Sequence, residues 1–124
     1  MKDTRLLTDK EKEIIAALIG ASDPKWAYLK EGLSSVRVSE MDDGGMGSLL
    51  FEGKDTKDRK LGNVIGNAEF DDRDGTPVSL GLNIDEDNQL FELDVWKVDY
   101  SRLISFPNAC ELKFQDMTKY NSIL

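Results

Sequence analysis

The sequence predicts an α+β fold, with two N-terminal helices packed on one face of a mainly antiparallel sheet of about five strands. Three observations support this fold class. Apolar residues recur at helical spacing over residues 9–33, and the spacing changes to strict alternation after Ser35. Two alternating segments within residues 78–95 then surround a polar turn, which is the pattern of a β-hairpin.

The first predicted helix begins after Thr8, because Thr8 and Glu11 have the spacing of a capping box. Gly20 supplies the stop at its other end. Between them lies a one-sided apolar stripe, made of Ile14, Ile15, Leu18 and Ile19.

A second, shorter helix is indicated by Ser22, Asp23 and Pro24, a capping side chain followed by a proline in the first turn. Its apolar face consists of Trp26, Leu29 and Leu33. The two helices are expected to form a helical hairpin that needs the rest of the chain to cover its apolar stripes.

The next segment predicts a β-hairpin with a glycine-rich turn. Val36 and Val38 lead into residues 42–45, and residues 48–51 lead out. A phosphate-binding loop is the alternative for residues 44–48, but it needs a strand-to-helix transition and usually a lysine after the glycines. Residues 54–60, which are charged and without apolar side chains, are expected to form a mobile loop.

A third strand is predicted over residues 61–70. One of its faces is small in the middle, which would let a helix approach the sheet closely. That face consists of Gly62, Val64, Gly66, Ala68 and Phe70. Residues 71–77, with an Asp-Gly pair and a proline, predict a turn.

The strongest hairpin signal follows. Its first arm buries Val78, Leu80, Leu82 and Ile84, and its second arm buries Phe91, Leu93 and Val95. The apolar positions then change parity, which predicts a β-bulge near Val95 and Trp96. We expect Trp96 to pack on the core side rather than serve as a ligand platform, and Lys97 to form a surface ion pair with Asp99.

Beyond Pro107, which ends the preceding segment, the alternation of Cys110, Leu112 and Phe114 predicts a short edge strand. Residues 115–124 have no clear period. The whole chain, residues 1–124, is therefore predicted to be a single domain. It divides into a helical hairpin at 1–33, an antiparallel sheet at 34–114 and an unassigned tail at 115–124.

The formal net charge is −8, and the excess of acid lies wholly in residues 34–124, because residues 1–33 hold six basic and six acidic side chains. This distribution disfavours nucleic-acid binding and suits a basic protein partner. The single cysteine, Cys110, excludes an internal disulfide, and no apolar run predicts a secretion signal or a membrane span. We therefore expect a cytoplasmic protein with no membrane contact.

The chain has no histidine, so the commonest general base and every Ser-His or Cys-His nucleophile arrangement are excluded. Cys110 is expected to be a small buried hydrophobe. The acidic turns do not fit an EF-hand, because the sixth position is Pro77 counted from Asp72 and Leu90 counted from Asp85. No metal, cofactor or catalytic residue is predicted.

Four carboxylates are candidates for a binding site, namely Asp42, Asp43, Glu92 and Asp94. Glu92 and Asp94 are two residues apart on a strand, so they share a face. They could form a negative surface for a basic partner or an acid/base couple, and the plainer interpretation is a solvated outer face.

The segment from Leu90 to Ser101 resembles a family of small, uncharacterised bacterial proteins that share an E-L-D-x-W-K-x-D-aromatic strand. The start of the chain, Arg5 to Thr8 with Glu11, is similar to the start of that family, so the resemblance covers most of residues 4–107. The family is defined by sequence alone, so the resemblance implies a bacterial source and one domain, but no site.

Two functions remain open at this stage. The first is a non-catalytic binding module, for example an immunity-type protein that covers a basic toxin or enzyme surface. The second is a carboxylate-based enzyme or small-ligand binder that uses a cleft near Glu92 and Asp94. A flat acidic face would favour the first, and a cleft that holds both carboxylates would favour the second. Composition leaves the oligomeric state and the identity of any partner undetermined.

Overall fold

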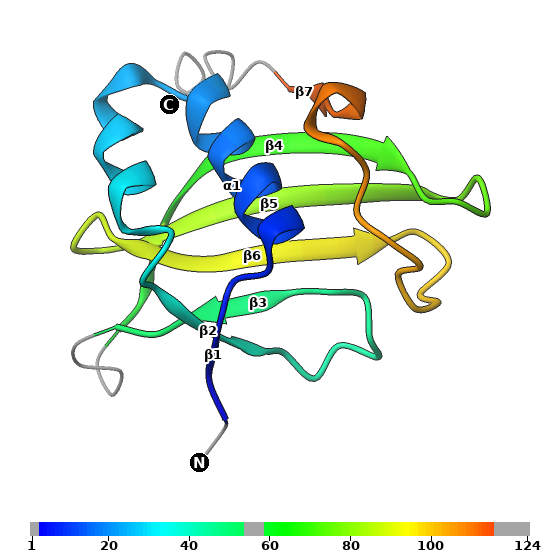
Figure 1. Cartoon of the computed structure of the whole chain (residues 1–124), viewed down its shortest axis with the longest axis horizontal. Helices are drawn as coiled ribbons and strands as arrows, with labels where there is room; N and C mark the ends of the chain where they lie inside the picture. Colours follow the sequence, from blue (N-terminus) through cyan, green and yellow to red (C-terminus); the bar gives the residue numbers. More distant parts are fainter. Residues whose placement is uncertain (1–2, 54–58, 116–124) are drawn as a thin grey trace.

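A computed structural model describes residues 3–53 and 59–115 of the chain (Figure 1). Most of the predicted mobile loop at 54–60 and most of the unassigned tail at 115–124 lie outside these described residues. Within them, one α-helix and two short 3₁₀ helices accompany a seven-stranded antiparallel sheet. The chain is therefore α+β, as predicted, but its sheet is larger than expected.

The elements follow in chain order. They are β1 (Arg5–Leu6), α1 (Asp9–Ala21), η1 (Pro24–Gly32), β2 (Arg37–Glu40), β3 (Leu49–Phe51), β4 (Leu61–Asp71), β5 (Pro77–Asp85), β6 (Leu90–Lys97), η2 (Ala109–Glu111) and β7 (Lys113–Phe114). The strand order across the sheet is β1-β2-β3-β6-β5-β4-β7. β1 has two residues, too short to show a period in the sequence, so it was not predicted. The edge strand predicted from Cys110, Leu112 and Phe114 is present as β7, although only Lys113 and Phe114 pair with β4.

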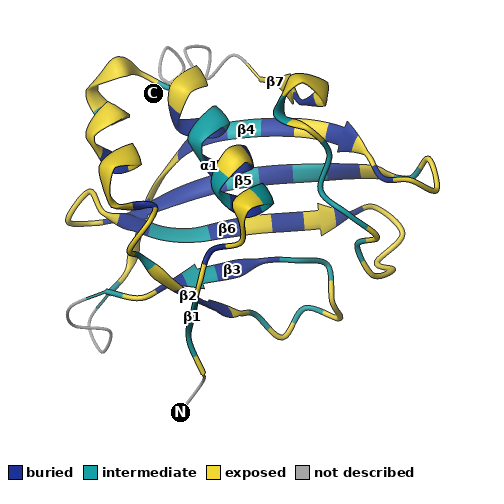
Figure 2. Cartoon of the chain, viewed as in Figure 1, coloured by how far each residue is buried: buried dark blue, intermediate teal, exposed yellow. Residues whose placement is uncertain are grey.

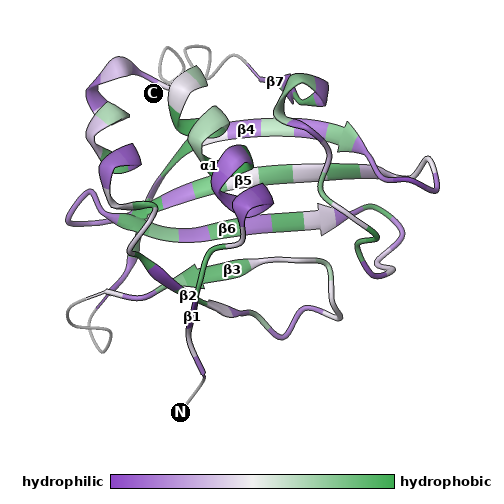
Figure 3. Ribbon diagram, viewed as in Figure 1, coloured by the Kyte–Doolittle hydropathy of each residue, from purple (hydrophilic) through white to green (hydrophobic). Residues whose placement is uncertain are grey.

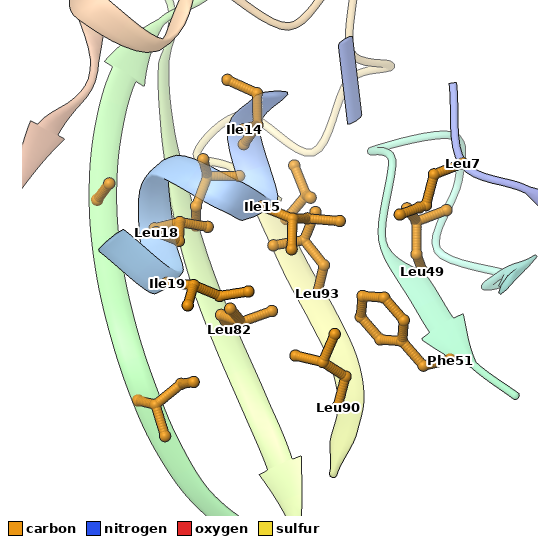
Figure 4. Packing of buried hydrophobic residues seen from close by; sticks show 14 of the residues in the cluster. Leu7, Ile14, Ile15, Leu18, Ile19, Leu49, Phe51, Leu82, Leu90 and Leu93 are labelled. Carbon is orange, nitrogen blue, oxygen red and sulfur yellow. The ribbon is translucent and has the colours of Figure 1, made fainter. Parts of the chain in front are cut away.

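α1 begins at the predicted capping box. The Thr8 hydroxyl accepts from the Glu11 N–H at 3.1 Å, and the Glu11 carboxylate accepts from the Thr8 N–H at 2.8 Å. Its apolar stripe is buried in the core, and Figure 4 shows Ile19 pointing toward Leu82 on β5 and Ile15 toward Leu93 on β6. The first turns of α1 carry hydrophilic residues on their outer side (Figure 3).

The second predicted helix, η1, is a 3₁₀ helix, so the structure does not confirm a hairpin of two α-helices. The Asp23 carboxylate caps its start by accepting from the Lys25 N–H at 3.0 Å. Its predicted apolar face is only partly buried: Leu29 and Leu33 are buried, whereas Trp26 is half-buried. A spacing of three between Trp26 and Leu29 suits a helix with three residues per turn.

The expected close approach of a helix to the third strand is confirmed. A Cβ added at Gly66 would lie 3.3 Å from the Leu18 carbonyl oxygen of α1. Two register shifts in β4 nevertheless divide the predicted face, since Val64 pairs with Asn83 on the opposite side of the sheet from Gly66. Val64 is exposed for this reason.

The predicted bulge at Val95 and Trp96 is wrong. The β5–β6 ladder is regular there, with Val95 opposite Leu80 and Trp96 opposite Ser79. Val95 is buried and Trp96 is 44% exposed, so the two side chains lie on opposite faces. The register shift of this pair falls instead at the other end of β6, where Ile84 pairs with Leu90 and Phe91 is the extra residue.

The core lies between α1, η1 and one face of the sheet. Buried residues alternate with exposed ones at the end of β6, as Figure 2 shows. We call the opposite side of the sheet the open face, because none of the described helices packs on it. Cys110 is exposed in η2 and is not the buried hydrophobe that was predicted, because Leu112 takes the inward position of this segment.

Candidate functional site

The open face brings two of the four candidate carboxylates together. Glu92 lies opposite Asn83 and Asp94 opposite Gly81, so both project from the side of the sheet away from α1. Glu69 lies on the same side, opposite Ser79. The centre of the open face therefore carries three carboxylates, on β4 and β6.

Glu92 is half-buried and Asp94 is exposed. Glu92 Oε1 accepts a hydrogen bond from Asn83 Nδ2 at 2.9 Å. Asn83 is 5% exposed, and its Oδ1 is a buried acceptor without a hydrogen-bond partner among the described residues. This amide fixes Glu92 in place, whereas Asp94 remains accessible to a partner.

Asp42 and Asp43 lie in the β2–β3 loop, and they differ in role. Asp42 is exposed. The Asp43 carboxylate accepts three hydrogen bonds from backbone N–H groups of its own loop, at Gly45, Met46 and Ser48, with distances of 3.0–3.2 Å. Although burial raises the pKa of Asp43, these hydrogen bonds outweigh it and hold the pKa below its ordinary value. Asp43 is therefore used to close the predicted glycine-rich turn.

A buried ionic cluster, which we call the Lys97 cluster, was not predicted from the sequence. Lys97 Nζ donates to Asp72 Oδ2 at 2.9 Å, to Asp74 Oδ2 at 2.8 Å and to the Arg102 carbonyl oxygen at 3.1 Å. The Lys97 side chain is 1% exposed, and that of Asp72 is fully buried. Lys97 thus lies on the core face and does not form the surface ion pair with Asp99.

The charge states of the Lys97 cluster follow from these contacts. Hydrogen bonding from Lys97 and from the Thr76 N–H lowers the pKa of Asp74 to about 2. The hydrogen bond to Asp74 in turn raises the pKa of Lys97. All three groups are therefore charged at neutral pH, since burial of Asp72 is outweighed by its hydrogen bonds and its pKa is also lowered.

Two sequence features pointed to the Lys97 cluster. Lys97 has the same parity as Leu93 and Val95, which is the parity of the core face. An acidic turn, residues 71–74, follows β4, and β4 is separated from β6 in the sheet by β5 alone. A lysine in a buried position and a turn with several carboxylates together indicate an internal ion pair.

The end of β6 and the residues that follow it, from Trp96 to Ile104, form a segment that presents apolar side chains to solvent. Trp96 and Tyr100 form an edge-to-face pair with ring centroids 6.2 Å apart. In this segment Trp96 is 44% exposed, Val98 42%, Tyr100 69% and Ile104 53%. Figure 1 shows this segment beside the β4–β5 turn and the β2–β3 loop, at one end of the sheet. The sequence suggested Tyr100 only as the last apolar residue of an alternation that continues the strand, whereas β6 ends at Lys97 and Tyr100 lies in the turn that follows.

A hollow of about 840 Å³ lies at the other end of the sheet. It is bordered by η1, by the ends of β2 and β3, and by the β5–β6 turn. The Arg59 guanidinium, one of its lining groups, donates to Asp85 at 2.8 Å and to the carbonyl oxygens of Phe51 and Leu90. All three guanidinium nitrogens are thus used internally.

A second hollow, of about 560 Å³, lies between the start of α1, the β4–β5 turn and residues 105–111. Neither hollow is lined by Glu92 or Asp94. Across residues 3–53 and 59–115, no group of three or more Cys, Asp or Glu side chains could hold a metal ion. In the same ranges, no helix is long and apolar enough to cross a membrane.

A comparison with protein-family models matches residues 4–107 to the family described as Domain of unknown function (DUF6984). Comparisons with curated proteins and with solved structures gave no match. The matched segment begins just before β1 and ends before η2, so it includes α1, β6 and the Lys97 cluster. Since it spans most of the sequence, the chain belongs to the family Domain of unknown function (DUF6984).

Proposed function

We propose that this chain is a non-catalytic protein-binding module that takes a basic partner on the open face of its sheet. The observation that carries this proposal is the placement of Glu92, Asp94 and Glu69 at the centre of a face that no described helix covers. Among the strand residues that the structure describes, Arg37 and Lys113 are basic and share this face, and they lie away from its centre on β2 and β7.

The net charge of the whole chain also favours a basic partner. A net charge of −8 attracts a basic protein over a distance and increases the rate of encounter. Aromatic side chains such as Trp96 commonly supply affinity at protein interfaces. An immunity-type protein in the cytoplasm, which covers a basic toxin or enzyme surface, is the form of this function that we favour.

The alternative, a carboxylate-based enzyme or small-ligand binder, needs a cleft that holds Glu92 and Asp94. The two hollows described above are lined by other residues. Paired carboxylates act as acid and base only where their surroundings separate their pKa values. The accessible position of Asp94 supports binding rather than such chemistry.

The test starts with capture of partners from the source cell, followed by measurement of association rates with the purified partner. The rate is expected to fall when salt rises from about 0.05 to about 0.5 M, because the Debye length shrinks severalfold. At low salt, the double variant Glu92→Gln with Asp94→Asn should associate more slowly than the wild type, since it lacks two charges on the open face.

Glu31→Gln with Asp87→Asn is the matched control, because it removes the same two charges from exposed positions on η1 and the β5–β6 turn. The control variant should associate at nearly the wild-type rate. The proposal is wrong if both double variants behave alike, or if neither salt nor the open-face variant changes the rate.

A further inference from the structure

We infer that the aromatic pair Trp96 and Tyr100, together with Asp94, receives an arginine side chain of the partner. This inference rests on the proposed function and deepens it, because it names the group that a basic partner would insert. The pair is exposed, hydrogen bonds hold its backbone, and the Asp94 carboxylate lies on the same face as Trp96.

Both rings are largely exposed to solvent, although large aromatic side chains are more often buried. They meet edge to face at 61°, and Tyr100, the more exposed of the two, is 69% accessible. Exposed tryptophan and tyrosine side chains are frequent centres of binding energy at interfaces. The pair leaves ring surface available to an incoming side chain.

The backbone that carries Tyr100 is held in a conformation that few residues adopt. Its φ is +63°, in the left-handed region, which is uncommon for an aromatic residue. The Tyr100 N–H donates to the Lys97 carbonyl oxygen at 2.9 Å, and Asp99 accepts from the Ser101 N–H at 3.0 Å and from its hydroxyl at 2.6 Å. A strained conformation that local hydrogen bonds maintain is a frequent mark of a binding site.

The Lys97 cluster anchors this segment from below. Lys97 donates to the Arg102 carbonyl oxygen, and Asp72 accepts from the N–H groups of Ile104 and Ser105 at 2.8 and 3.3 Å. The segment is therefore fixed on both sides of Tyr100 before any partner arrives. A site that is already ordered loses less entropy on binding.

The charges favour a guanidinium. Asp94 and Trp96 are two residues apart on the same face of β6, roughly 7 Å along the strand, so one side chain can contact both. A guanidinium stacks on aromatic rings and pairs with carboxylates through its planar fork, whereas an ammonium is more strongly hydrated. Arg102, two residues after Tyr100 in the sequence, lies against Gly45, with its Cγ and Cζ 3.1 Å from a Cβ placed there. It does not fill the site.

The first experiment uses the full chain and defined peptides. The chain has two tryptophans, Trp26 and Trp96, so an ¹H–¹⁵N spectrum contains two indole signals. Titration with N-acetyl-Gly-Arg-Gly-amide should shift the Trp96 signal in a saturable manner and leave Trp26, which lies on η1, unchanged. The same peptides with citrulline or lysine in the central position should bind more weakly.

Two variants locate the site. Tyr100→Asn removes the ring but tolerates a left-handed φ, and Asp94→Asn removes the charge. Each should weaken binding of the arginine peptide by roughly two- to fivefold, the size expected for an exposed cation–π contact or ion pair. Glu31→Gln is the control and should leave the titration unchanged. A titration that never saturates, that is equal for citrulline or lysine, or that is unaffected by both variants overturns the arginine site.

The two proposals can fail separately. If a partner binds in a salt-dependent manner that Glu92→Gln with Asp94→Asn weakens, but Tyr100→Asn leaves partner and peptide binding unchanged, only the arginine site is wrong. If the peptide titration behaves as expected and no basic partner shows salt-dependent association, the proposed function is wrong.

Discussion

Lys97 shows how a single residue decides the faces of β6. Its ammonium occupies a core position because Asp72 and Asp74 neutralise it, and its neighbour Trp96 is placed on the open face as a result. A rule that buries aromatic residues and exposes lysines gives the opposite assignment. The sequence prediction of a bulge followed from that rule. It failed because Asp72 and Asp74 lie within reach of Lys97 and make its burial stable.

Replacement of Lys97 by methionine is therefore expected to lower the urea midpoint of unfolding at neutral pH. Methionine fills a similar volume, but the buried carboxylate of Asp72 loses its cation, and a buried charge without a partner is unfavourable. Lys30→Met, on the surface of η1, is the matched control and should leave the midpoint nearly unchanged. Equal midpoints for wild type and Lys97→Met would show that the cluster does not stabilise the fold.

Single elements differ in how well the sequence predicts them. α1 and the β5–β6 hairpin are confirmed, because both have long periodic patterns and polar ends. β1 is a two-residue strand that forms only because β2 is available beside it. η1 has the cap and proline of a helix, but its three-residue spacing is compatible with two helix types, so local signals leave the type undecided.

The packing of α1 on the sheet leads to a stability prediction. Leu18 is fully buried, so Leu18→Ala should lower the free energy of unfolding by roughly 2–5 kcal/mol. Leu61→Ala is the same change at a position that is 52% exposed, and it should have an effect of about 0.5 kcal/mol or less. Urea unfolding of both variants provides the comparison. If the Leu18 variant is as stable as the Leu61 variant, α1 does not contribute to the core.

The fold class and one pair of candidate residues could be predicted for the molecule as a whole. Glu92 and Asp94 share a face because alternation on a strand is a property of the sequence. The burial of Lys97 depends on the carboxylates of Asp72 and Asp74 in the β4–β5 turn. The core-face parity of Lys97 is visible in the sequence, but the contacts that neutralise its charge join distant parts of the chain, so no local pattern reveals them.

The Lys97 cluster should contribute to the pH dependence of the stability of the whole molecule in acid. The pKa of Asp74 is about 2 in the folded chain, against an ordinary value of 3.8. The stabilisation that it provides is therefore complete above about pH 4 and is lost as the pH falls toward about 2. Asp74→Asn should make the urea midpoint less dependent on pH between 4 and 2, and Asp87→Asn should not. Parallel pH curves for the Asp74 variant and wild type would contradict this expectation.

The strand order has a consequence for how fast the molecule folds. β4, β5 and β6 are joined by two consecutive hairpins, so their pairing closes only short loops. β3, by contrast, lies beside β6, and Leu49 meets Leu93 only after the chain has passed through the whole of β4 and β5. Closing that longer loop carries an entropic cost before any contact compensates it. Folding is thus expected to begin in the β4–β6 meander, and the docking of the β2–β3 hairpin sets its rate.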